Sequence, residues 1–159
     1  MATNLSPLGE HSNKNIGNIS GKTISVVISE WNDQITDALF IAAQEALVAY
    51  GARENNIKVK YVPGSFELTL GAQLEAQKTD VDAVICLGCV IQGETRHFDF
   101  ICDAVANGIT NVGLKYNKPV VFGVLTTNNL QQALDRAGGK HGNKGEEAAI
   151  TVIKMLAIS

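Results

Sequence analysis

The sequence predicts a single α/β domain, with a four-stranded parallel, flavodoxin-like sheet in a three-layer α/β/α arrangement. Two observations lead to this fold class. Segments with strand character alternate with segments of helical periodicity, and this βαβαβαβα order is typical of parallel sheets with right-handed crossovers. The chain has 159 residues, of which 45% are apolar, which suits one domain with a sizeable core. We expect a polar N-terminal arm over residues 1–18 and the domain over residues 19–159.

Composition and charge argue against several classes of function. The net charge of −3 is not that of a nucleic-acid-binding surface. No apolar stretch approaches the roughly 20 residues that span a bilayer. The segment over residues 1–20 has neither a basic start nor an apolar centre, so it does not resemble a secretory signal. We therefore expect a cytoplasmic protein with no nucleic acid and no membrane among its partners.

The first half of the chain predicts two strand–helix pairs. A β-branched apolar run precedes a helical pattern that Gly51 ends. Ile57, Val59 and Tyr61 alternate with other residues, as in a strand that is less buried than the first. Ser65 follows a Pro-Gly break and can cap the next helix. The strands are predicted at residues 23–29 and 57–62, and the helices at residues 34–50 and 66–78.

The second half predicts two more pairs. An apolar run from Ala83 to Leu87 has the length and content of a buried parallel strand. The helical pattern after it places Phe98, Ile101 and Val105 on one face. A fourth strand, a short helix, a glycine-rich loop and a last helix complete the order, and they are predicted at residues 118–126, 130–137, 138–142 and 143–157.

Three cysteines raise the question of a redox or metal site. Cys86 and Cys89 have a Cys-x-x-Cys spacing. Cys86 lies inside a strand pattern, however, whereas a redox pair lies where a helix starts. No second Cys or His pair has the spacing of a zinc site. Together with Cys102, we interpret these residues as buried thiols that form neither a disulfide framework nor a metal site.

The stretch from Gly88 to Asp99 is the most informative part of the chain. It joins the third strand to the next helix, and ligands bind at such junctions in open parallel sheets. Backbone N–H groups in the first helical turn favour an anion, and the Thr95 hydroxyl adds a donor. His97 suggests proton transfer beside a bound phosphate. The alternative is that His97 is only a surface residue, since short motifs give false positives.

The carboxyl ends of all four predicted strands should meet at one edge of the sheet. The segments after the strands offer aromatic faces, a carboxylate and an anion-binding turn, which together suit a flat heteroaromatic ring, a polyol and a phosphate. The residues concerned are Trp31 and Asn32 after the first strand, Ser65, Phe66 and Glu67 after the second, and Val90, Ile91 and residues 93–97 after the third.

Two basic residues fit this edge less easily. Arg136 and Lys144 flank the last loop, which a single copy of the fold does not bring to the same site. From their spacing alone we favour a solvated basic loop. If they are functional, the site lies between subunits.

These segments together resemble the 6,7-dimethyl-8-ribityllumazine synthase family from about residue 19 to residue 158. Five segments in the right order are more specific than any one motif. The family condenses 5-amino-6-(D-ribitylamino)uracil with 3,4-dihydroxy-2-butanone 4-phosphate, and it uses no cofactor and no metal. The matching segments are residues 31–32, 63–67, 88–99, 122–127 and 136–145.

The resemblance implies a role for each candidate residue. His97 would transfer protons, and Arg136 of the adjacent subunit would bind the phosphate as it leaves. The pyrimidinedione ring would contact Trp31, the main chain of Val90 and Ile91, and the adjacent subunit's Phe122, with Lys144 of the adjacent subunit nearby. The ribityl chain would bind to Asn32, Ser65, Phe66 and Glu67. The phosphate would bind to Gly93, Glu94 and Thr95.

Two of these positions depart from the family pattern. Glu94 puts a carboxylate into a phosphate cradle, which requires its side chain to point outward while its N–H points inward. Trp31 stands where some members carry Phe. Because its larger aromatic face should retain flavin-like molecules better, we expect the protein to bind riboflavin, although weakly.

The resemblance also implies a homo-oligomer. The family forms pentamers, and in some members twelve pentamers build a 60-subunit icosahedral shell. The turn over residues 138–143 is compact and glycine-rich, as in shell-forming members. Association with riboflavin synthase is a further implied partnership.

Two alternative functions compete with this activity. One is a flavin-binding or shell-forming relative without the activity, which the intact His97 and Arg136 argue against. The other is a same-fold enzyme that dismutates lumazine to riboflavin, which a full phosphate site disfavours because that substrate has no phosphate.

Overall fold

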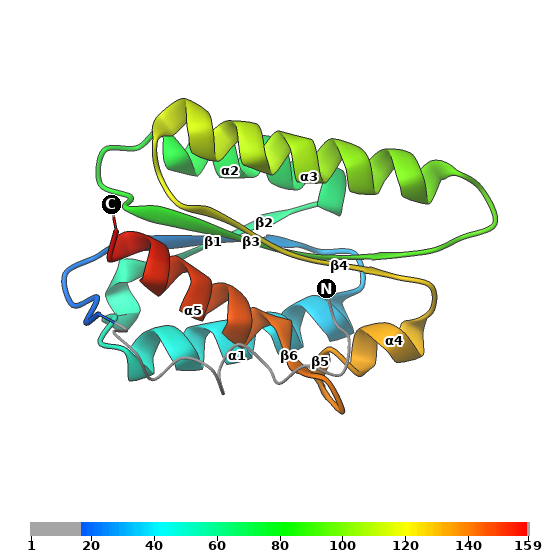
Figure 1. The fold of residues 1–159 in the computed structure, drawn as a ribbon, viewed down its shortest axis with the longest axis horizontal. Helices are drawn as coiled ribbons and strands as arrows, with labels where there is room; N and C mark the ends of the chain where they lie inside the picture. The colour runs from blue at the N-terminus through cyan, green and yellow to red at the C-terminus, as the bar shows by residue number, and fades with distance from the viewer. Residues whose placement is uncertain (1–16, 159) are drawn as a thin grey trace.

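The core of the protein is a four-stranded sheet in the order β2-β1-β3-β4, in which every neighbouring pair is parallel (Figure 1). The computed structural model describes residues 17–158, so the predicted arm lies almost wholly outside the described residues. The strands are β1 (Ile24–Ser29), β2 (Ile57–Val62), β3 (Ala83–Ile91) and β4 (Val120–Thr127). This topology confirms the predicted parallel sheet.

Helices cover both faces of the sheet, which gives the predicted three layers (Figure 1). One face carries α1 (Asp33–Ala49) and α5 (Lys144–Leu156), and the other carries α2 (Leu68–Ala76) and α3 (His97–Tyr116). None of the helices within residues 17–158 combines the length and the apolar character that crossing a membrane requires. The connections contain the short elements η1 (Glu54–Asn56), η2 (Ser65–Glu67), α4 (Leu130–Leu134), β5 (Ala137–Gly139) and β6 (Gly142–Asn143).

Strand β1 joins the two apolar clusters of the core. All six of its residues are buried. Val26 and Ile28 belong to the cluster beneath α1 and α5, whereas Val27 belongs to the cluster beneath α2 and α3. A strand covered on both faces reads as a nearly continuous apolar run, and this explains why the sequence pattern predicts it closely.

The start of α5 is fixed against α1. Gly145 approaches the carbonyl oxygen of Leu39 so closely that no side chain would fit there. Asn143 caps the helix, because its Oδ1 accepts a hydrogen bond from the Gly145 N–H at 2.8 Å. The Nδ2 of Asn143 also donates to the carbonyl oxygen of Ala38 at 3.0 Å. Lys144, between the cap and the glycine, therefore has a backbone position set by contacts on both sides.

The third strand is longer than the sequence predicts. A strand end at Leu87 is wrong, because β3 continues through Gly88 to Ile91. Strand β4 pairs with it along this whole extension, as far as Ile91 opposite Thr127. The junction between β3 and α3 therefore consists of residues 92–96.

The second helix begins differently from the prediction. Ser65 does not cap it, because residues 65–67 form a turn of 3₁₀ helix and α2 starts at Leu68. The carboxylate of Glu67 makes the local contact instead, accepting a hydrogen bond from the Gly64 N–H at 3.0 Å.

The glycine-rich segment predicted as a loop is a small antiparallel hairpin. Strand β5 pairs with β6. Gly138 and Gly142 have φ angles of 107° and 73°, which glycine adopts without the steric cost that other residues meet. Because the hairpin begins at Ala137, α4 ends earlier than the predicted helix.

Cys86 and Cys89 are buried, as the sequence predicts, whereas Cys102 is only partly buried. Burial raises the pKa of the Cys86 thiol to about 12 and that of Cys89 to about 11. Both lie in β3, and Cys102 is partly buried in α3. Thiols with such pKa values are poor nucleophiles at neutral pH. Within residues 17–158, no cluster of His, Cys, Asp and Glu side chains could hold a metal ion.

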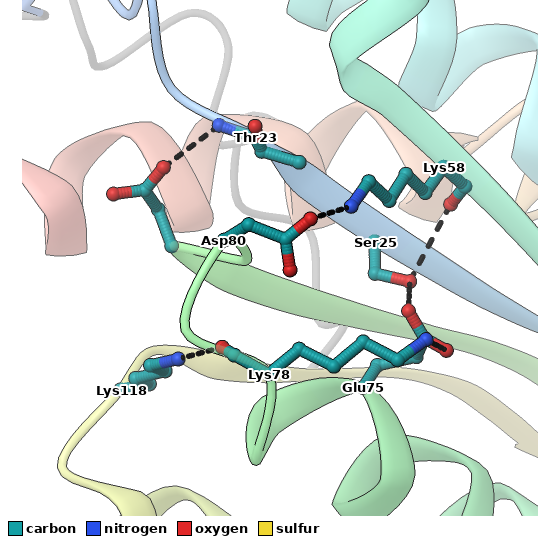
Figure 2. Close-up of polar contacts among 8 residues, drawn as sticks. Thr23, Ser25, Lys58, Glu75, Lys78, Asp80 and Lys118 are labelled. Carbon is teal, nitrogen blue, oxygen red and sulfur yellow. Dashed lines mark hydrogen bonds and ion pairs between the residues drawn. The ribbon is translucent and has the colours of Figure 1, made fainter.

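A buried carboxylate ties α2 to the sheet at the end remote from the strand carboxyl termini (Figure 2). Glu75 is only 4% exposed. Its Oε2 accepts a hydrogen bond from the Ser25 hydroxyl at 2.9 Å, and its Oε1 contacts the Lys78 ammonium at 2.5 Å. Burial raises the pKa of Glu75, but these contacts outweigh burial and hold the pKa below its usual 4.5. The ionised form is therefore the one that the fold stabilises.

Replacing Glu75 with Gln should lower the melting temperature at pH 7. The substitution removes the charge while keeping the size, and loss of a charged hydrogen bond in a buried site costs about 1–3 kcal/mol. Because the folded pKa lies below the unfolded one, the contribution of Glu75 is complete above pH 4.5 and is lost as the pH falls through the folded pKa. The difference in melting temperature between wild type and Glu75→Gln should therefore shrink on acidification.

Asp80→Asn is the matched control. Asp80 pairs with Lys58 at 2.5 Å, but its side chain is 68% exposed, and exposed pairs contribute little. Thermal unfolding of the three proteins from pH 7 to pH 3 makes the comparison. A Glu75→Gln protein as stable as wild type at pH 7 would show that the buried carboxylate does not hold α2 in place.

Candidate active site

The candidate residues fall into two groups in different parts of the fold. The first group lies at the carboxyl ends of β1, β2 and β3, which share one edge of the sheet because the strands are parallel. The second group lies along the edge strand β4 and at the start of α5. The two groups have different surroundings and offer different chemistry.

Asn32 connects the end of β1 to the end of β3. Its Nδ2 donates to the carbonyl oxygen of Cys89 at 2.9 Å. Its backbone has φ 62° and ψ 45°, a left-handed conformation that Asn tolerates better than most residues. The carbonyl oxygen of Asn32 accepts the first backbone hydrogen bonds of α1, from Ile35 and Thr36. The turn is thus fixed at both of its ends.

Two large aromatic side chains lie exposed in the first group. Trp31 is 76% exposed and Phe66 is 56% exposed. They follow neighbouring strands, and the Trp31 N–H donates to the Pro63 carbonyl oxygen at 3.3 Å, which joins the two turns. Large aromatic side chains exposed in two joined turns make this edge a candidate binding surface. A flat ring is a ligand that such faces suit.

Ser65 packs against β3 only because residue 88 is glycine. A Cβ atom at Gly88 would lie 2.8 Å from the Ser65 Oγ and 3.3 Å from the Ser29 Oγ. Ser65 is buried, and the Ser29 hydroxyl is buried without a hydrogen-bond partner among the described residues. The turn over Ser65–Glu67 therefore packs directly against β3 at Gly88.

The junction after β3 carries the residues that the sequence predicts to bind an anion and to transfer protons. Its start is fixed, because the Gln92 N–H donates to the Thr127 carbonyl oxygen at 2.8 Å. Thr95 and His97 are exposed at the amino end of the 20-residue helix α3. The His97 N–H points to the Thr95 Oγ1 at 3.4 Å. The positive end of a helix with open backbone donors favours a phosphate.

The other candidate residues in the junction and at the end of β3 are exposed or only partly buried. Nothing lies within 4 Å of the Cβ position at Gly93, so its backbone is open to an approaching group. Glu94 is exposed. Val90 and Ile91 are the last residues of β3, and both are partly buried.

The second group lines a groove beside β4. The groove has a volume of about 1210 Å³ and runs between α3 and α5, and β4 is the outer strand of the sheet there (Figure 1). Phe122 projects from β4 and is partly exposed. Arg136 and Lys144 line the same groove. This differs from the solvated basic loop that their spacing favours, because the hairpin of β5 and β6 turns the chain back and brings the two residues together.

Backbone and side-chain contacts hold the two basic residues beside each other. The Lys144 N–H donates to the Arg136 carbonyl oxygen at 2.9 Å. The Arg136 Nη1 donates to the Gln132 carbonyl oxygen at 2.9 Å, and the guanidinium has four further N–H donors. The groove thus presents an aromatic face and two cations.

The two groups do not meet within one copy of the chain. The lining of the groove contains Phe122, Arg136 and Lys144, but none of the first group. A ring bound on Trp31 and a phosphate bound beside His97 would lack the cationic partners that lie in the groove. The two groups of candidate residues are therefore separate within one chain, and we call them the two half-sites.

Comparison with known proteins shows the family to which the chain belongs. The sequence profile of the 6,7-dimethyl-8-ribityllumazine synthase family matches residues 21–159. The chain belongs to this family. Similar proteins that carry the name 6,7-dimethyl-8-ribityllumazine synthase occur in Cytophaga hutchinsonii, with 64% identity over 142 residues and 89% of each chain covered, and in Parabacteroides distasonis, with 48% identity over 159 residues, 100% of this chain and 99% of the relative.

Membership of the lumazine synthase family confirms the resemblance drawn from the five motif segments. A third relative, from Bacteroides fragilis, is 53% identical over 131 residues, which cover 82% of this chain and 92% of the relative. The matched range of residues 21–159 includes both half-sites.

One residue of this lumazine synthase fold escaped the sequence analysis. Glu147 lines the groove, and its carboxylate contacts the Lys144 ammonium. The signal that could have found it is the spacing of three residues between a basic and an acidic side chain in the first turn of a helix. A run of two glutamates at a helix start is also what the helix dipole favours, so the sequence gives no reason to single out the second one.

Proposed function

We propose that this protein is a 6,7-dimethyl-8-ribityllumazine synthase, which condenses 5-amino-6-(D-ribitylamino)uracil with 3,4-dihydroxy-2-butanone 4-phosphate and releases phosphate and water. The observation that carries the proposal is the pair of half-sites in a member of this family. One half-site offers aromatic faces, hydroxyls and a helix amino end, and the other offers an aromatic face and two cations. Each suits a different part of the two substrates.

The pyrimidinedione and its ribityl chain fit the first half-site. Trp31 offers the ring an exposed aromatic face, and the main chain at Val90 and Ile91 lies at the end of the central strand. The polyol requires donors and acceptors close together. These are offered by the side chains of Asn32, Ser65 and Glu67, with Phe66 beside them.

The phosphate of the second substrate fits the amino end of α3. Backbone N–H groups at Gly93 and Glu94 and the Thr95 hydroxyl form the cradle in this proposal. The exposure of the Glu94 side chain is compatible with a carboxylate that points away from the anion. Arg136 of an adjacent subunit supplies the positive charge, since a guanidinium can bind phosphate through two parallel hydrogen bonds.

The chemistry then requires orientation and proton transfer. The amine of the pyrimidine attacks the ketone, water leaves to give an imine, and elimination releases the phosphate with its bonding electron pair. The enol that remains becomes a ketone, and the second nitrogen attacks its carbonyl carbon and closes the ring as a second molecule of water leaves. Each step moves protons and none changes the redox state, so the protein's own groups suffice without a cofactor. The imidazole of His97 suits the proton transfers, and holding amine and ketone together lowers the barrier by several kcal/mol.

Product formation is the direct test of the proposal. The purified protein is incubated with both substrates, and the fluorescence of the lumazine is followed against reactions that lack one substrate. We expect fluorescence to rise only when protein and both substrates are present. A protein that binds riboflavin but forms no lumazine would support the alternative, a flavin-binding or shell-forming relative without the activity.

Replacing His97 with Ala should lower kcat by about 10²-fold, the usual range for a general acid–base group. Imine chemistry proceeds slowly without a catalyst, so some activity should remain. The backbone cradle is unchanged, and the inhibition constant of inorganic phosphate should therefore stay close to that of wild type. Steady-state kinetics with phosphate as a competitor measures both values. Wild-type turnover in the variant would remove His97 from the mechanism.

We further propose that the two half-sites join between neighbouring subunits of a pentamer, and that twelve pentamers form a 60-subunit shell. The open edge of β4 and the partly exposed Phe122 support a subunit contact there. The compact hairpin with two glycines of positive φ leaves room for close approach between pentamers. A cytoplasmic location and association with riboflavin synthase stay predictions of the family resemblance.

Light scattering tests the assembly. A shell of this kind should give particles with about 60 times the mass of the chain, whereas a lone pentamer gives about five times that mass, since closed symmetric oligomers have defined subunit numbers. The measurement is repeated across a range of pH and phosphate concentration. Particles no larger than a pentamer under all conditions would exclude the shell.

A further inference from the structure

Glu147 and Lys144 form the closest ion pair in the groove beside β4. The Lys144 Nζ lies 2.7 Å from the Glu147 Oε1 and 2.8 Å from its Oε2. The two side chains are only 26% and 14% exposed. Both residues line the groove together with Phe122 and Arg136. This pair is therefore more enclosed than an ordinary surface salt bridge.

The position of Lys144 on α5 makes a partner necessary. Lys144 is the first residue of this 13-residue helix, where the helix dipole disfavours a positive charge. Arg136 adds a second positive charge in the same groove. Without a carboxylate nearby, a long and flexible ammonium side chain would extend into water. Glu147, one turn along the helix, offsets both unfavourable effects.

Glu147 is itself held on a rigid element. Its carbonyl oxygen accepts a hydrogen bond from the Thr151 hydroxyl at 2.7 Å. The turn that carries it is capped by Asn143 and packed against α1 through Gly145. A side chain on such a support can orient a neighbouring group with precision.

We propose that Glu147 is a positioning residue, which holds the Lys144 ammonium toward the pyrimidinedione and thereby sets the affinity for that substrate. An ammonium has three N–H donors. Two of them face the carboxylate oxygens of Glu147, and the third is left for a carbonyl oxygen of the ring. The inference rests on the proposed function, because it assigns Lys144 to the pyrimidine substrate.

Steady-state kinetics of Glu147→Gln in the assembled protein tests the proposal. The amide keeps the size of the side chain but loses the charge that orients Lys144. We expect KM for the pyrimidine substrate to rise by about 10-fold, the size of effect that loss of a charged hydrogen bond produces. The KM for the butanone phosphate should stay unchanged, and kcat should change by less than about 3-fold. Glu147→Asp, which keeps the charge, should recover part of the loss.

Glu146→Gln is the matched control. Glu146 lies next to Glu147 in the first turn of α5, but it is exposed. It experiences the same helix dipole and loses the same charge on substitution. Its kinetic constants should equal those of wild type, so any effect confined to Glu147→Gln comes from the groove.

A double-mutant cycle with Lys144→Met separates positioning from a general structural role. If Glu147 acts through Lys144, Glu147→Gln should have no further effect on KM in the Lys144→Met protein. Equal effects of Glu147→Gln in both backgrounds, or an unchanged KM in the single variant, would overturn the proposal. If Glu147→Gln does not fold, the same cycle with Glu147→Asp decides it. Wild-type activity is measured alongside, so failure of the proposed function itself would show as a wild type that forms no lumazine.

Discussion

The pairing of β3 with both of its neighbours is the interaction on which the whole site depends. β3 pairs with β1 on one side and with β4 on the other, and the pairing with β4 continues to Ile91. The Asn32 amide and the Gln92 N–H extend these contacts beyond the ladders. The turn after β1, the junction before α3 and the edge strand β4 are thus all positioned by one central strand. Gly88 in this strand also admits Ser65.

The open edge of β4 supports the proposal that the two half-sites join between neighbouring subunits. An unpaired strand edge with a partly exposed aromatic residue is a surface that proteins cover. Covering it with a second copy would bring Phe122, Arg136 and Lys144 to the exposed Trp31 and His97 of that copy. Substrate binding and subunit contact would then use the same residues, and each would stabilise the other. The Lys144–Glu147 pair lines the groove beside this edge.

Much of this architecture could be predicted from periodicity. The bounds of β2 match the prediction, because Ile57, Val59 and Tyr61 alternate and a Pro-Gly break follows. The end of β3 could not be predicted from periodicity, because Gly88 resembles a turn residue. Only the pairing with β4 shows that Gly88 continues the strand. Arg136 and Lys144 lie close together because of a hairpin with positive-φ glycines, a tertiary feature without periodicity. The sequence does not single out Glu147, because only its contact with Lys144 in the folded chain distinguishes it, and no motif marks it.

The most direct test of a site shared between neighbouring subunits is complementation between two variants of low activity. Arg136→Ala removes the cation of one half-site, and His97→Ala removes the imidazole of the other. When the two proteins are dissociated, mixed and reassembled, some subunit contacts join an intact His97 to an intact Arg136. If neighbouring chains share the site, lumazine formation should then rise above that of either parent. A mixture shown by mass to have exchanged subunits, yet no more active than its parents, would contradict a site shared between neighbouring chains.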